Sequence, residues 1–194
     1  ATEGTDYGSL SDITISAGAT TGTTTFTPTD DSMYETSTDE TATVAIDTVS
    51  GGSATENGTQ SVTITINENE SAPTVTLAAS ATSIAENAGS SITITASLSG
   101  TTSQDVTVSL SSSSTATEGT DYGTVSDITI SSGSTSGTAT FTPTDDSLYD
   151  ATSNETAILS ISGVSGGGAT ESGDQKVTIT IIDNESAPTV TLSV

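Results

Sequence analysis

The chain repeats itself after 115 residues. The octet ATEGTDYG at residues 1–8 returns at 116–123, and 54 of the 79 positions that align residues 1–79 with 116–194 are identical. This period is much longer than the roughly 20 to 50 residues of a solenoid repeat and matches the length of a small independent domain. The repeated object is therefore a whole domain, and one sequence pattern has to specify it twice.

Threonine or serine alternates with β-branched apolar residues along most of the chain, and no window shows helical spacing. This alternation predicts strands with one buried and one exposed face. Glycine- and serine-rich turns separate the strands, as is typical of an antiparallel sandwich. We predict an all-β fold of tandem immunoglobulin-like β-sandwiches with about seven strands per unit. The complete unit contains candidate strands near 74–77, 83–85, 91–98, 105–110, 127–131, 138–143, 156–162 and 176–182.

Pro73 and Pro188 each precede the motif TVTL, where a proline is able to open a strand but not to lie within a central one. We therefore expect the C-terminal portion of one unit at 1–70, a complete unit at 71–185, and the first strand of a following unit at 186–194. The first portion has candidate strands at 12–16, 22–27, 41–46 and 61–67. Four strands cannot cover both sides of a sandwich core, so we expect strands from outside the given sequence to complete them.

Composition excludes several classes of function. The chain has 25 acidic side chains, one basic side chain and no cysteine or histidine, which gives a formal net charge of −24. Such a chain repels nucleic acid and anionic membranes, and it contains no apolar run long enough for membrane insertion. Thiol, histidine and arginine chemistry is also excluded, so we expect no enzyme. An extracellular or cell-surface location is consistent with the lack of cysteine.

The acidic residues gather at strand ends and in loops, whereas the strand faces are almost uncharged. Carboxylates collected at one pole of a sandwich would repel one another without a cation. Calcium (Ca2+) suits such a group because it accepts six to eight oxygen ligands in loose geometry. The alternative is that acidic loops only keep a Ser/Thr-rich surface soluble. The candidates in the complete unit are Glu86, Asp121, Asp145, Asp146, Asp150, Glu155, Asp183 and Glu185.

Four motifs occur in a fixed order: IAEN after the first strand, ATEGTDY in the middle, a DD pair followed by an acidic loop and ET, and an acidic exit before a proline-started strand. This combination resembles the Calx-beta domain, the calcium-binding sandwich of sodium/calcium exchangers. The resemblance implies that the residues above, together with Asn184, are calcium ligands and that the metal lies where one unit meets the next. In the first copy it implies Asp6, Asp30, Asp31, Glu35, Glu40, Glu68 and Glu70.

We therefore expect a non-enzymatic, calcium-rigidified stalk or filament of a cell-surface protein or adhesin. Its expected partners are adjacent copies of the same repeat, joined covalently or by strand complementation. A calcium-sensing regulatory module is the first alternative, and a carbohydrate-binding or adhesive module is the second. Sequons that could carry glycans occur at Asn57, Asn69, Asn154 and Asn184.

Overall fold

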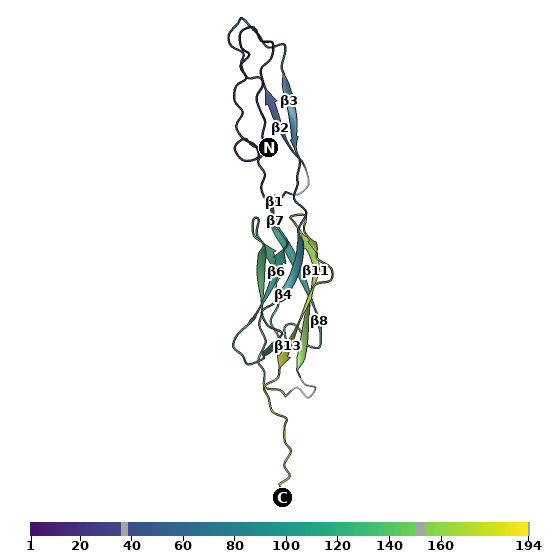
Figure 1. Cartoon of the computed structure of the whole chain (residues 1–194). Helices are drawn as coiled ribbons and strands as arrows, with labels where there is room; N and C mark the ends of the chain where they lie inside the picture. Colours follow the sequence, from purple (N-terminus) through teal and green to yellow (C-terminus); the bar gives the residue numbers. More distant parts are fainter. Residues whose placement is uncertain (36–38, 150–153, 194) are drawn as a thin grey trace. The chain divides into compact units, whose positions relative to one another are not determined.

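The computed structural model of the chain describes residues 1–35, 39–149 and 154–193. The described residues form two compact units (Figure 1). The first unit contains residues 1–32 and 39–70, and the second contains 71–149 and 154–193 together with the short strand β1 (Met33–Tyr34). No helix long and apolar enough to cross a membrane occurs among the described residues.

The second unit is a sandwich of two sheets, which confirms the predicted fold class. One sheet has the order β10-β6-β4-β12 and the other has the order β5-β13-β11-β8-β9. The strands of the first sheet are β4 (Thr74–Ala79), β6 (Ile92–Leu98), β10 (Ser136–Phe141) and β12 (Thr170–Glu171). Those of the second are β5 (Ser83–Ala85), β8 (Val106–Ser114), β9 (Ile128–Ile130), β11 (Glu155–Ser165) and β13 (Lys176–Ile182).

The core lies between the two sheets and follows the alternation of the sequence. On β6, Ile92, Ile94, Ala96 and Leu98 are buried, and the threonines and serine between them are more exposed. The two largest buried side chains, Tyr122 and Phe141, stack with their ring centroids 4.7 Å apart. Aliphatic residues and one aromatic pair therefore fill the core of this sandwich.

The parallel pairing of β5 with β13 positions the acidic residues of the second unit. Ala85 lies opposite Ile182, and the Glu86 amide donates to the Ile182 carbonyl at 3.1 Å. Because the two strands run in the same direction, the residues that follow them leave the sheet side by side. Glu86 is thereby brought to the exit of the last strand, almost a hundred residues later in the sequence.

The first unit contains one regular pair, in which β2 (Glu40–Ala45) lies antiparallel to β3 (Ser61–Ile66). The prediction of strands at 12–16 and 22–27 is wrong, because neither segment belongs to a strand. Their counterparts in the second unit, β9 and β10, form ladders with β8 and β6. Alternation predicts which residues share one face, but a strand also needs a paired neighbour, and in the described part of the first unit no ladder includes 12–16 or 22–27.

Candidate metal centre

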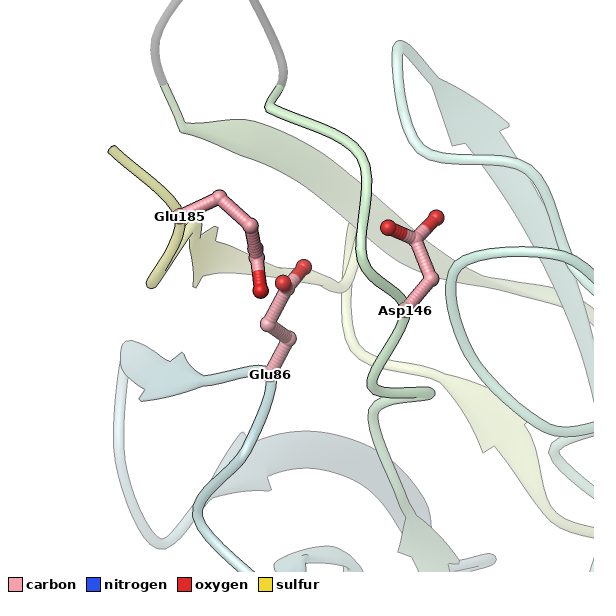
Figure 2. A group of neighbouring side chains, drawn as sticks. All are labelled: Glu86, Asp146 and Glu185. Atoms are coloured by element: carbon pink, nitrogen blue, oxygen red, sulfur yellow. The ribbon is translucent and has the colours of Figure 1, made fainter. Parts of the chain in front are cut away.

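Three carboxylates from three different elements meet in the second unit. Glu86 follows β5, Asp146 lies in the loop after β10, and Glu185 follows β13 (Figure 2). One carboxylate oxygen from each lies within 4.8 Å of those of the other two. Among the described residues, this is the group of acidic side chains whose spacing suits a metal ion.

Local hydrogen bonds hold two of these side chains in place. The Asp146 Oδ1 atom accepts from the Leu148 amide at 2.6 Å. The Asn184 side-chain amide donates to Glu185 Oε1 at 2.8 Å, and the Glu185 amide donates to Asp183 Oδ1 at 2.8 Å. These contacts fold the two loops back on themselves. The Glu86 and Glu185 carboxylates point toward each other (Figure 2).

Two carboxylate oxygens of the cluster have no hydrogen-bond partner, and the pKa of Glu86 is raised. Only 8% of Glu86 is exposed, and both Glu86 Oε1 and Glu185 Oε2 are buried without a hydrogen-bond partner. Burial raises the pKa of Glu86 to about 7, and the adjacent Glu185 carboxyl and the charges of Asp183 and Asp146 act in the same direction. Buried polar atoms are ordinarily satisfied, so these oxygens point to a missing partner.

The donor set fits a hard divalent cation. The cluster offers only oxygen atoms, which suit calcium, magnesium or manganese and disfavour metals that select nitrogen or sulfur. The only basic side chain of the chain, Lys176, begins β13, whereas Glu185 lies beyond its end. A cation is therefore the natural charge partner of Glu86, Asp146 and Glu185.

A cavity of about 350 Å³ opens beside the cluster. Glu86 and Asp145 line it, so the two neighbours Asp145 and Asp146 face different surroundings. Asn87, the last residue of the IAEN motif, also lines the cavity. The other uncharged residues of the wall belong to none of the acidic motifs, although some lie in the loop that follows IAEN. They are Gly89, Ser90, Ser91, Thr142 and Pro143.

Three other expected ligands of the second unit, Asp121, Glu155 and Asn184, do not belong to the three-carboxylate group. An Asp121 carboxylate oxygen accepts from the Thr117 amide at 2.6 Å, within its own turn. Glu155 begins β11 and lies opposite Ile181 of β13, two residues before Asp183. Asn184 presents its amide nitrogen to Glu185 rather than to a shared centre. Asp150 lies outside the described residues.

The first unit repeats part of this arrangement. The Asn69 side-chain amide donates to Asp30 Oδ1 at 3.0 Å, and the Glu70 amide donates to Glu68 Oε1 at 2.9 Å. The Glu68 carboxylate is the main cause of a raised pKa at Glu70, followed by burial and the charges of Glu68 and Asp30. The exit motif ENE therefore folds toward the DD pair here too.

The remaining expected residues of the first copy are more dispersed. Asp6 accepts from the Thr2 amide through its side chain and from the Thr29 amide through its carbonyl, which places it beside the DD pair. Asp31 and Glu35 are exposed, and Glu35 directly follows β1. Glu40 begins β2 opposite Ile66.

Comparisons with known proteins bear on this architecture. The Calx-beta domain family matches residues 1–70 and again 68–185. Similar solved structures include the apo form of the Calx CBD1 domain, at 16% identity and a TM-score of 0.49, covering 59% of this chain and 100% of that one. Another is CBD12 from CALX1.2, at 18% identity and a TM-score of 0.45, covering 53% of this chain and 41% of that one. A comparison with curated proteins finds no match. On the two family matches, which together span most of its length, the chain belongs to the Calx-beta domain family.

Proposed function

We propose that this protein binds calcium through Glu86, Asp146 and Glu185, with Asp145, Asp183 and the neighbouring loop carbonyls in reach as further oxygen donors. The observation that carries the proposal is the meeting of three carboxylates within 4.8 Å, two of which have a buried oxygen without a partner. The wider ligand set, including Asp121, Asp150, Glu155 and the residues of the first copy, remains part of this proposal.

We further propose that the calcium-loaded units act as a non-enzymatic structural array at the cell surface. The duplication supports this role, because 54 of 79 aligned positions are identical and repeating one domain adds length rather than a second specificity. The acidic, cysteine-free composition is compatible with an extracellular setting. In this array the partners of each unit are adjacent copies of the same repeat. Asn57, Asn69, Asn154 and Asn184 are exposed candidates for glycans.

A calcium titration of the whole chain tests the metal site. Isothermal calorimetry should show binding to the unaltered chain, strong weakening in Glu86→Gln and Glu185→Gln, and no change in Asp174→Asn. Asp174 is a matched acidic control because it is exposed and precedes the start of β13, at the opposite end of that strand from the cluster. Equal binding by all four proteins would overturn the proposed site.

The affinity separates the structural array from a regulatory sensor. Extracellular calcium modules bind with dissociation constants of about 0.1 to 1 mM, whereas sensors bind at about 0.1 to 10 µM. A constant near the millimolar range is the expected result for a surface array. A constant of a micromolar or below would instead support a calcium-sensing regulatory module.

A further inference from the structure

The second unit includes a two-residue strand, β1, that is separated in sequence from the rest of the unit. Strand β1 pairs in parallel with β7 (Thr101–Thr102), so that Met33 lies opposite Thr101 and Tyr34 opposite Thr102 (Figure 1). The Ser103 amide donates to the Tyr34 carbonyl at 3.0 Å, and both side chains of β1 are partly buried. Residues 30–32 and 39–70, on either side of this segment, belong to the first unit.

Glycines make room for this strand. A Cβ atom at Gly168 would lie 2.5 Å from Tyr34 Cε1, and one at Gly133 would lie 3.9 Å from Met33 Cε. Gly166, Gly167 and Gly168 all have positive φ, and the fully buried Thr102 donates through its hydroxyl to the Gly167 carbonyl at 3.2 Å. A side chain at Gly168 would therefore collide with the tyrosine ring unless one of the two moved. We call β7 with Gly133 and Gly166–Gly168 the β7 socket.

The second unit carries its own copy of the docked segment. DDSMY at 30–34 corresponds to DDSLY at 145–149, so Leu148 and Tyr149 stand where Met33 and Tyr34 stand in the first copy. In contrast to β1, Leu148 is 69% exposed and Tyr149 is 42% exposed. Burying this adjacent pair of apolar side chains against a partner would be favourable, because each removes apolar surface from water.

We infer that Leu148–Tyr149 is a docking strand for a further unit of the same repeat. It adds in parallel to the β7 socket of that unit, and the Tyr149 ring lies over the glycine equivalent to Gly168. The occupied β7 socket of the second unit shows the chemistry of the contact, since it holds the equivalent pair. This inference rests on the proposed array and names the contact that joins its members.

The test uses the chain extended by its own repeat, with residues 71–194 appended after Glu185. Hydroxyl-radical labelling followed by mass spectrometry measures the oxidation rate of the Tyr149 in the second unit, separately from its copy in the appended unit. In calcium, this rate should fall several-fold on extension, toward that of Tyr34. Gly168→Ser in the appended unit should restore it, because the first copy carries Ser53 at this position and the serine Cβ would meet the ring. Gly173→Ser is the matched control, as Gly173 also has positive φ but nothing within 4 Å.

A second variant tests the same docking without an appended unit. Met33→Leu gives β1 the Leu-Tyr pair of the second unit, and Tyr34 should stay as protected as in the unaltered chain. Loss of that protection would show that the β7 socket rejects the Leu-Tyr pair. Unchanged oxidation of Tyr149 in the extended chain would also overturn the inference. Neither result affects the calcium titration, so failure of the docking contact and failure of the metal site are distinguishable.

Discussion

Ile13 and Ile128 occupy the same position in the two copies of the repeat, yet 54% of Ile13 is exposed whereas Ile128 is fully buried. Ile15 and Ile130 differ in the same way, at 57% and 0%. On β9, Ile128 lies opposite Val108 of β8, and both belong to the core of the sandwich. The same residue in nearly the same local sequence therefore contributes very differently to stability.

This pair gives a matched test of the packing. Ile128→Ala should lower the free energy of unfolding of the second unit by about 2 to 5 kcal/mol, the usual range for a fully buried isoleucine. Ile13→Ala should change the stability by about 0.5 kcal/mol or less, as expected at an exposed position. Differential scanning calorimetry of the two variants is the measurement. Similar losses in both would show that Ile13 is covered in solution.

Removal of calcium should lower the melting temperature of the second unit. A ligand that binds only the folded state stabilises it by about 2.7 kcal/mol at a hundredfold excess over its dissociation constant. Melting curves recorded in chelator and after restoring calcium measure the effect. Glu86→Gln should melt at the same temperature in both conditions, and an unaltered chain that did so would argue against a metal in this cluster.

Asp146 and Asp127 should separate metal binding from fold stability. Asp146→Asn should weaken calcium binding at least tenfold, because Asp146 belongs to the three-carboxylate group. Asp127 accepts from the Ser109 hydroxyl at 2.8 Å and from the Leu110 amide at 3.2 Å, and both of these residues belong to β8. Asp127→Ala should therefore leave the calcium affinity unchanged and cost about 1 kcal/mol of stability.

Asp145 provides a finer test of the same loop. It lines the cavity that Glu86 also lines, and it lies outside the group of three carboxylates. Asp145→Ala should weaken calcium binding more than Asp127→Ala does, since it removes a nearby negative charge. Calorimetric titration of both variants decides this, and an Asp145→Ala affinity equal to that of the unaltered chain would remove Asp145 from the site.

The raised pKa of Glu86 predicts how the metal-free protein responds to pH. The folded pKa of about 7 exceeds the ordinary value of 4.5, so the folded state binds this proton more tightly than the unfolded state does. The stability in chelator should consequently fall as pH rises from about 4.5 to about 7, by roughly 1.4 kcal/mol for each unit of pKa difference. Denaturant titrations at several pH values measure this, and Glu86→Gln should flatten the dependence.

Much of the fold was predictable because alternation reports which residues face inward. Strands β4, β6, β8, β10, β11 and β13 all lie where the pattern predicted them. The two-residue strands β1, β7 and β12 were not predicted. They pair with distant segments, and two residues are too few to show an alternating pattern in the sequence. Residues 12–16 show the converse, because the same DITIS that contains β9 in the second copy forms no strand in the first.

The sequence predicted which loops carry the acidic residues of the site, but not how these residues are arranged in space. Its acidic motifs mark strand ends, which suggested one shared pole. The sequence cannot show that β5 runs parallel to β13, and this pairing is what brings Glu86 to Glu185. Nor does it show that Asp145 and Asp146 diverge, with one lining a cavity and the other joining the cluster.

The contact between Glu86 and Glu185 also bears on chain entropy. The two residues are 99 positions apart, so a cation held by both would close most of the second unit into a single loop. A covalent cross-link over a loop of this length stabilises a protein by about 4 to 5 kcal/mol in the chain-entropy model. The chain has no cysteine and so no disulfide, and the metal would act instead as a reversible cross-link. This cross-link would form when calcium is abundant and would open without any redox chemistry.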